Sequence, residues 1–476
     1  MMPTAYQALL LRKINMINQP TQWLAVIGLL FFSLCSGAYA QANALPLSKG
    51  ELARQQAAAI IANSSTAQAL QQLALQYDIP IGLYVDGLTG RLKKEKKADF
   101  KRVRYTPAFI LLNAKRVQGG VVPLIDILLT SEGAPLFVSF ESGVEVPPEI
   151  FNKLEAVVYL RFSLIGSGSN VLNLENYFSL EGLYIRGGSF TEIKLPKLSS
   201  LIAMNIYSET VSEIRNLELQ TKLDILMLNT RAMNSYDKLK NHPALRYFNA
   251  NVEGSTLDLG SLSKLEYLVA TYFSEKNVRN LNKLSMLNTL VLYVPKFNEA
   301  AKVNLPKKIK YMRIVLDKDL IFTEFKDLPE LETLFITSSP HVDLPVLQGL
   351  PKLQKLEINK SKLSSLAGLK QIPQVKEVIL TDSQITSLEP LKSMTDMTNL
   401  EVLDLADNAI TEFSGVGDKP HIKYIGLSHN PLKKVDVEAL AKYPYCSLGH
   451  AGTYISRLDT PELYQKILSI YQNGHP

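Results

Sequence analysis

Apolar residues recur along this chain with a period close to 22 residues between Leu180 and Leu432. One of the clearest copies places leucines at positions 400, 403 and 405 and is followed by Ile410, and the next copy repeats the same spacing from Ile422. The first apolar position of successive copies falls at residues 180, 201, 223, 245, 265, 287, 309, 331, 353, 375, 400 and 422. A fixed period of roughly 20–29 residues indicates stacked units that share one continuous core. The pattern therefore predicts a solenoid of short parallel strands over residues 151–440, with about 12–13 repeats.

The segments on either side of the repeats follow other patterns. Residues 41–150 begin with a helix-capping pair, Ser48 and Glu51, and continue with a second expected helix at 66–77. Short apolar runs at 81–84 and 136–140 have the character of strands, so a small α/β domain is expected here. After Leu440 the period stops, and residues 441–476 are expected to form a helical cap, with a helix that begins at Thr460.

The first 40 residues have the features of an export signal. Two basic residues, Arg12 and Lys13, precede an apolar run at 23–34, and Ala38-Tyr39-Ala40 supplies a small-x-small cleavage site. The apolar run is shorter than the roughly 20 residues that cross a bilayer, and no later stretch is long enough. We expect cleavage after Ala40 and export to the periplasm, cell surface or medium, with no membrane span afterwards. An uncleaved anchor is the alternative.

Cysteine content and charge refine this picture. Cleavage would remove Cys35 and leave Cys446 as the only cysteine, so the stacked core rather than a disulfide must stabilise the fold. Of the formal net charge of +6, the whole excess lies in residues 91–104, which hold eight basic and two acidic residues. The basic side chains of this segment are Arg91, Lys93, Lys94, Lys96, Lys97, Lys101, Arg102 and Arg104. They predict either a solvated hairpin or a site for anionic lipid or glycan, whereas nucleic acid is the least expected ligand of an exported protein.

The repeats resemble the 22-residue leucine-rich repeats of internalin-type bacterial surface proteins. This resemblance implies a curved right-handed solenoid with a parallel concave sheet and 3₁₀ turns on the convex side, which the triplets 363/366/369 and 385/388/391 also suit. The buried asparagine of that family is present at Asn408 and Asn430. Earlier repeats carry other residues at this position, so we expect the C-terminal half to be regular and the N-terminal half to be less regular or more open.

The outward-facing positions of five successive strands carry no charged residue. These fifteen positions are Ala203, Asn205, Tyr207, Ile225, Met227, Asn229, Tyr247, Asn249, Asn251, Tyr267, Val269, Thr271, Thr289, Val291 and Tyr293. With 20% of the chain charged, about three charges would be expected by composition. Beyond them Phe335 continues the surface, Arg313 interrupts it, and charges return at Lys355 and Glu357. An uncharged aromatic strip is typical of a protein-binding site. The alternatives are that these residues are simply good strand formers, or that the N-terminal domain covers them.

The predicted contacts for a protein or peptide partner are Tyr207, Met227, Tyr247, Tyr267, Val291, Tyr293 and Phe335. The candidates for an anionic ligand are Lys93, Lys94, Lys96, Lys97, Lys101, Arg102 and Arg104.

Catalytic chemistry has weak support in the sequence. Asp382, Asp407 and His429 occupy one column of successive repeats, but that position lies at the edge of the strand, where such residues are usually solvated. Cys446 and His450 suggest a thiol nucleophile, but too short a segment follows for a catalytic domain. Motifs for phosphate, metal or hydrolase chemistry are missing, so we expect no catalytic residues, no metal and no cofactor. The leading interpretation is a non-enzymatic binding protein that uses its concave face. The alternative is an envelope-associated protein that binds anionic lipid or glycan through the basic segment.

Overall fold

A computed structural model describes residues 49–76, 81–85, 125–129, 133–140, 153–163, 170–198, 200–233, 235–273, 277–294, 305–316, 325–337, 344, 347–440, 442–443 and 445–447. The expected signal segment 1–40, the basic segment 91–104 and the expected helix after Thr460 lie outside these residues. The chain divides into two compact units, residues 1–141 with 148–154, and residues 142–147 with 155–476.

The described part of the first unit contains two helices and three strands. Helix α3 (Lys49–Asn63) is followed by α4 (Ser65–Gln76), and the hydroxyl of Ser64 caps α4 by accepting a hydrogen bond from the backbone N–H of Ala67 at 3.2 Å. Strand β1 (Ile81–Val85) pairs in parallel with β2 (Ile125–Leu129), and β2 pairs antiparallel with β3 (Pro135–Phe140). Strand β2 has no counterpart among the elements expected from the sequence.

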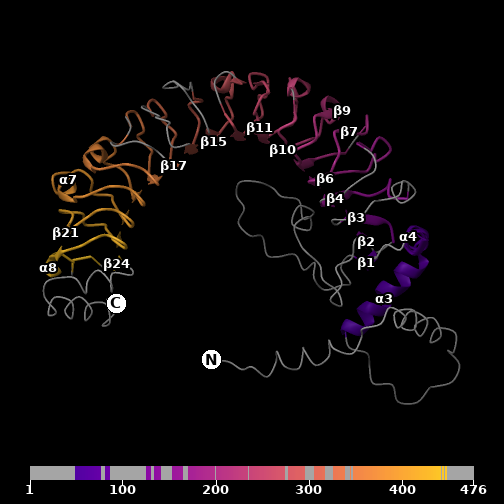
Figure 1. The fold of residues 1–476 in the computed structure, drawn as a ribbon, viewed down its shortest axis with the longest axis horizontal. Coiled ribbons are helices and arrows are strands. Elements are labelled where there is room, and N and C mark those ends of the chain that lie inside the picture. Colours follow the sequence, from indigo (N-terminus) through magenta and orange to yellow (C-terminus); the bar gives the residue numbers. More distant parts are fainter. Residues whose placement is uncertain are drawn as a thin grey trace, which may run out of the picture. The chain divides into compact units, whose positions relative to one another are not determined.

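The second unit is the solenoid that the period predicts. Its main sheet is built entirely of parallel pairs, and each strand pairs with the equivalent strand of the next repeat. In order, the strands are β4 (Tyr159–Ser163), β6 (Gly182–Arg186), β8 (Ala203–Tyr207), β10 (Ile225–Asn229), β11 (Tyr247–Asn251), β13 (Tyr267–Thr271), β15 (Thr289–Val294), β16 (Tyr311–Leu316), β17 (Thr333–Thr337), β18 (Lys355–Asn359), β19 (Glu377–Ile379), β20 (Val402–Asp404), β22 (Tyr424–Gly426) and β24 (Tyr445–Ser447). Figure 1 shows these strands on the inner, concave side of the solenoid.

The opposite, convex side carries short strands and single helical turns. The strands form three small parallel sheets: β5 (Val171–Asn173), β7 (Glu192–Lys194) and β9 (Glu213–Arg215); β12 (Leu257–Asp258) and β14 (Val278–Arg279); and β21 (Glu412–Phe413) and β23 (Lys434–Val435). The helical turns are η1 (Leu217–Leu219), η2 (Asp237–Leu239), η3 (Leu281–Lys283), η4 (Ala367–Gln371), α7 (Glu389–Lys392) and α8 (Val437–Leu440). The expected 3₁₀ turn at 363–369 is present as η4, whereas the one at 385–391 is a single α-helical turn that begins with Glu389-Pro390.

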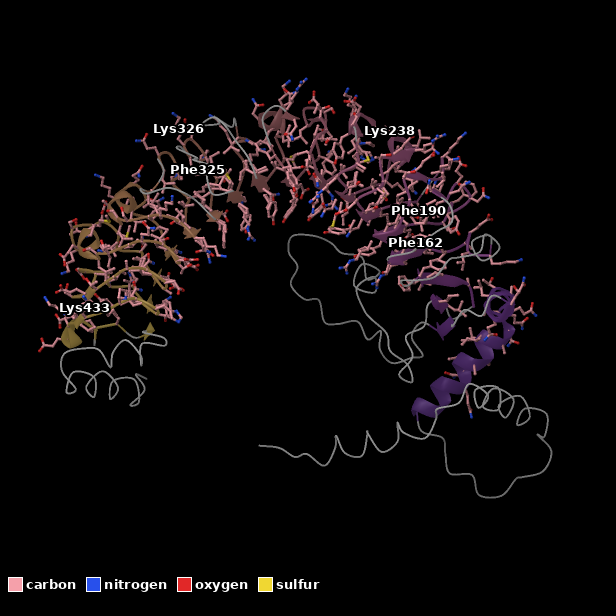
Figure 2. The ribbon with its side chains drawn as sticks, in the orientation of Figure 1. Phe162, Phe190, Lys238, Phe325, Lys326 and Lys433 are labelled. Carbon is pink, nitrogen blue, oxygen red and sulfur yellow. The ribbon has the colours of Figure 1, made fainter. Side chains whose placement is uncertain are left out.

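The core of the solenoid lies between these two sides. The leucines and isoleucines of the repeat are almost completely buried, and Phe162 and Phe190 pack edge to face with ring centroids 6.0 Å apart. Phe325 and its neighbour Lys326 show how sharply the inside is separated from the outside, because Phe325 is buried and Lys326 is exposed (Figure 2). Each repeat thus stacks its apolar face on the next, as the periodicity predicts.

The two family asparagines make the expected bonds between neighbouring turns. The amide nitrogen of Asn430 donates to the carbonyls of Leu405, at 2.8 Å, and Leu427, at 3.1 Å, while its oxygen accepts from the N–H of Ile410 at 2.9 Å. Asn408 has the same arrangement, with its amide nitrogen 2.7 Å from the carbonyl oxygen of Leu380. One side chain thus satisfies backbone groups of two adjacent repeats, which polar groups in a dry core require.

The expected irregularity of the N-terminal half is wrong for the main sheet. Strand pairing runs without a register shift from β4 to β13, and these strands are five residues long, whereas β19, β20, β22 and β24 have only three. The buried leucines set the register of the strands, so the asparagine is not needed for it. In an early repeat Thr230, one residue before the asparagine position, makes a different bond to the preceding repeat, because its hydroxyl donates to the carbonyl of Val211 at 2.6 Å.

A charged column runs along the edge of the main sheet, immediately before each strand. From β10 to β22 the signs alternate where the column is charged, in the order Asp224, Arg246, Glu266, Lys310, Glu332, Lys376, Glu401 and Lys423, with Asn288 and Gln354 between; Glu181 and Ile202, before β6 and β8, do not continue this alternation. Neighbouring members form ion pairs: Arg246 with Asp224, Lys310 with Glu332 at 3.1 Å, and Lys423 with Glu401 at 2.6 Å. Exposed pairs of this kind each contribute little to stability, but a stacking that skipped one charged repeat would bring like charges together.

Candidate binding surface

Strand pairing aligns the outward-facing residues of the main sheet into three columns. In the first column Tyr247 pairs with Tyr267, and in the third Tyr207 pairs with Asn229. We call the fifteen outward residues of β8, β10, β11, β13 and β15 the concave patch; they are the uncharged residues named above, from Ala203 to Tyr293. At about 4.8 Å between strands, the patch is roughly 20 Å long and three residues wide.

Exposure within the concave patch is uneven. Tyr207 and Tyr293 in the outer column are 54% and 37% exposed, which places both among the most exposed large apolar side chains described. Val291, in the middle column, is only 6% exposed because Val269 and Arg313 flank it on the neighbouring strands, so it offers a partner little surface. Six of the fifteen positions are buried, namely Ala203, Ile225, Asn251, Val269, Thr289 and Val291, so the patch presents tyrosine rings above a largely buried floor.

The centre of the concave patch is a stacked pair of tyrosines. The rings of Tyr247 and Tyr267 lie 4.4 Å apart at 14° to each other, and both are partly buried. Met227 and Asn249 occupy the next column and are also partly buried. Stacked rings lose little conformational entropy when a ligand covers them, so this pair is suited to anchor a partner.

Arginine–aromatic pairs occur at both ends of the surface, and the sequence analysis did not identify them. The guanidinium carbon of Arg161 lies 5.6 Å from the ring centroid of Tyr184, and that of Arg313 lies 5.1 Å from the ring centroid of Phe335. Each pair is in direct register across neighbouring strands. The sequence does contain a signal for these contacts, because in each pair the arginine and the aromatic residue are one repeat apart. The spacing is 23 residues for Arg161 and Tyr184 and 22 residues for Arg313 and Phe335. Phe335, a predicted contact, is thus partly covered by Arg313.

The structure brings two members of the candidate acid–base column together. The Nδ1 atom of His429 lies 3.3 Å from Oδ1 of Asp407, and about half of each side chain is exposed. Both residues and Asp382 have positive φ angles, of 57°, 57° and 51°, because they form the turn after each strand. A solvated pair in a turn fits the structural interpretation rather than a catalytic one.

Other candidate sites gain no support from the described residues. Cys446 lies in strand β24, where its backbone pairs with Ile425, and His450 lies outside the described part of the chain. Within the described ranges, His, Cys, Asp and Glu residues form no cluster of three or more that could hold a metal ion. Within the same ranges, every helix is too short or too polar to cross a bilayer.

Comparison with known proteins agrees with the repeat. The leucine rich repeat family matches residues 373–432. A protein of Arabidopsis thaliana whose name assigns it to disease resistance is 30% identical over 145 residues, which is 29% of this chain and 16% of that protein. The chain thus spans only a small part of the length of this relative.

Solved structures include similar solenoids at low sequence identity. A leucine-rich-repeat protein from Leptospira interrogans is 15% identical, with a TM-score of 0.47 over 69% of this chain and 92% of that one. An internalin from Listeria monocytogenes is 16% identical, with a TM-score of 0.36 over 68% of this chain and 85% of that one. Residues 373–432 are thus similar to leucine-rich repeats, and the described strands of the second unit form a parallel solenoid.

Proposed function

We propose that this protein is a non-enzymatic interaction protein, exported from the cell, that holds a protein or peptide partner on its concave patch. The observation that carries the proposal is the run of fifteen outward positions without a charge. Two of these positions hold the exposed rings of Tyr207 and Tyr293. Exposed aromatic side chains with interspersed amides are the composition of protein interfaces.

The contacts within the patch support a binding interface rather than a surface whose residues were selected only because they favour strands. The stacked rings of Tyr247 and Tyr267 give a rigid apolar area, while Asn249 in the next column, and Asn205 and Asn229 elsewhere on the patch, supply hydrogen-bond donors and acceptors. Strand propensity alone would favour tyrosine and valine but would not remove every charge from five successive strands. Of the predicted contacts, we assign the main part to Tyr207, Tyr247, Tyr267 and Tyr293, with Met227 and Phe335 at the margins.

The test is partner capture with a variant that removes the tyrosine rings. The full chain would be cross-linked in an extract of the cell envelope and in a host-cell lysate, beside a variant with Tyr207, Tyr247, Tyr267 and Tyr293 all changed to Ser. Circular dichroism and urea unfolding would first establish that the variant folds. We expect the native chain to retain a partner that the variant loses, because truncation of several aromatic anchors removes most of the binding energy of an interface.

A matched control variant removes apolar surface elsewhere. Phe178, Leu198, Leu219 and Met286 are exposed apolar side chains that lie outside the strands of the main sheet. Their simultaneous change to Ser should leave the captured partner in place. If both variants recover the same partner as the native chain, the concave patch is not the binding site, and the basic segment 91–104 becomes the candidate.

A further inference from the structure

Arg313 is an isolated charge on the concave side of the solenoid. Of the outward residues on β8, β10, β11, β13, β15, β16 and β17, all of them described, it is the only one that is charged. Its direct neighbours in the same column are Val291 and Phe335, and Tyr311 and Val315 flank it along its own strand. A cation with four apolar or aromatic neighbours is an exception that calls for a physical reason.

The guanidinium of Arg313 has no hydrogen-bond or ion-pair partner among the described residues, and its Nε atom is buried. Two other arginines of the solenoid, by contrast, have polar partners: Nε of Arg161 donates to Ser163 at 3.1 Å, and Arg246 pairs with Asp224. The guanidinium carbon lies 5.1 Å from the centroid of the Phe335 ring, which is a cation–π contact. The ring has no oxygen or nitrogen atom that could accept a hydrogen bond from the guanidinium. A buried N–H without an acceptor is destabilising, so a ligand that supplies an acceptor here gains a hydrogen bond that the protein itself does not make.

A second unsatisfied polar atom lies on the neighbouring strand. The hydroxyl oxygen of Thr337 is buried and has no hydrogen-bond partner within the described part of the chain. Thr337 pairs with Val315, and Phe335, two residues before it, pairs with Arg313, so the hydroxyl and the guanidinium are diagonal neighbours on one face. Together they offer several N–H donors and one O–H donor on diagonal positions about 7–8 Å apart, in surroundings that are otherwise apolar.

We propose that Arg313 and Thr337 bind a single carboxylate carried by an otherwise apolar peptide segment of the partner. This inference rests on the proposed function and specifies the chemistry of the ligand. A carboxylate matches the planar fork of one guanidinium, and a hydroxyl can donate to its second oxygen. A phosphate with nearly two charges would need a further cation, but the next base on this face, Lys355, is already paired with Glu357 and Glu377 at 3.6 and 3.1 Å.

The position of Arg313 relative to the tyrosine stack sets the spacing of the ligand. Strand β16 lies two strands beyond β13, so Arg313 is displaced from Tyr267 by about 10 Å across the strands. An extended peptide covers this distance with about three residues. The bound segment therefore places an apolar side chain over Tyr247 and Tyr267 and its carboxylate about three residues away.

Labelled synthetic peptides test this proposal directly on the full chain. The probes are eight-residue pools randomised over Leu, Phe, Tyr, Val and Ser, in three arms. One arm has a fixed Glu and an amidated end, the second has Gln in place of Glu, and the third has no acidic side chain but a free terminal carboxylate. We expect at least one carboxylate arm to bind about tenfold tighter than the Gln arm, because a desolvated charge pair discriminates strongly. The arm that binds identifies the source of the carboxylate.

Three variants assign the preference to this site. Arg313→Gln should abolish the difference between the arms, and Thr337→Val, which keeps the shape of the side chain, should reduce it about threefold or more. Arg186→Gln is the matched control, because Arg186 is an exposed arginine on the same face of β6, and it should keep the full preference.

Equal binding of all arms to the native chain, or an unchanged preference in Arg313→Gln, overturns the carboxylate site. Loss of the preference in Arg186→Gln also overturns it, because the preference for a carboxylate would then come from the net positive charge of the face and not from Arg313. If the tyrosine variant loses its partner but no peptide arm depends on Arg313, the proposed function stands and this inference fails. If the tyrosine variant keeps its partner, the proposed function itself fails.

Discussion

Single polar side chains inside the solenoid bond to the backbone of the neighbouring repeat. The ammonium of Lys419, only 5% exposed, donates to the carbonyls of Leu391 at 3.0 Å and Met394 at 2.8 Å, and burial lowers its pKa. His242 has a similar role, with Nε2 at 3.0 Å from the carbonyl oxygen of Gln220 and Nδ1 at 3.4 Å from the backbone nitrogen of Ala244. These contacts fit a neutral ring that donates through Nε2 and accepts through Nδ1.

His242 should make the stability of the protein depend on pH. Burial lowers the pKa of its imidazole, and the hydrogen bond to Gln220 only partly opposes this effect. The unfolded chain therefore binds the proton more readily, so the free energy of unfolding falls as the pH drops below about 6.5, until the lower pKa of the folded state is passed. Urea midpoints of the native chain and of His242→Gln, measured between pH 8 and pH 5, should converge toward acid pH.

An exposed histidine provides the comparison for this pH effect. His421 lies at the surface, so His421→Gln should leave the acid-dependent loss of stability in place. A His242→Gln variant that loses as much stability between pH 8 and pH 5 as the native chain would show that other groups cause the effect.

At the level of elements, the strands and the turns after them are held by different residues. Buried leucines fix the strands, whereas Asn408 and Asn430 fix the turns, and Ser361 and Ser383 bond to each other at 2.6 Å in the repeats before them. The turns with positive φ at Lys360, Asp382, Asp407 and His429 follow these strands in successive repeats. A residue at the asparagine position therefore affects the local geometry of one turn rather than the register of the sheet.

Removal of Asn430 should destabilise the C-terminal repeats. Its side chain is 2% exposed and bonds to the carbonyls of Leu405 and Leu427 and to the N–H of Ile410. In Asn430→Ala these buried groups lose their partner, with an expected loss of about 2–4 kcal/mol in the free energy of unfolding. Hydrogen exchange should accelerate first in the repeats next to residue 430, because a solenoid opens locally.

Asn205→Ala is the companion measurement, since Asn205 lies on the concave patch and is partly exposed. Its expected effect is within about 0.5 kcal/mol. Similar losses of stability in the two variants would contradict the distinction between turn and surface asparagines.

For the whole molecule, the two candidate ligand surfaces differ in their electrostatics. The concave patch has no charge on fifteen positions, whereas residues 91–104 carry a net charge of +6. Partner binding through the patch should therefore change by less than about threefold between 50 and 500 mM salt, because screening acts mainly on exposed charges. Binding measured by surface plasmon resonance across this range separates the two surfaces, and a steep decrease in affinity with salt would favour the basic segment.

The sequence predicts the repeats of this fold far better than it predicts exposure within the site. The period defines the main-sheet strands, since leucines at fixed spacing can be buried together in only one register. It also places Tyr207 and Tyr293 correctly on the outward face. It does not show that Val291 is covered, because burial on that face depends on which side chains of neighbouring strands lie over it. For the same reason the contact of Arg313 with Phe335 is visible only once the strands are paired.

The alternating charges before each strand constrain how such an array can gain or lose repeats. Deletion of the unit that carries Arg246 would bring Asp224 next to Glu266, whereas deletion of the units of both Arg246 and Glu266 would leave Asp224 followed by Asn288 and then Lys310, with no like charges adjacent. Loss of two adjacent charged repeats preserves the alternation, loss of one inner charged repeat breaks it, and the neutral repeats of Asn288 and Gln354 can each be lost singly. Among the charged repeats, the unit that can be removed without placing like charges side by side is thus a pair of turns, twice the length of the structural period.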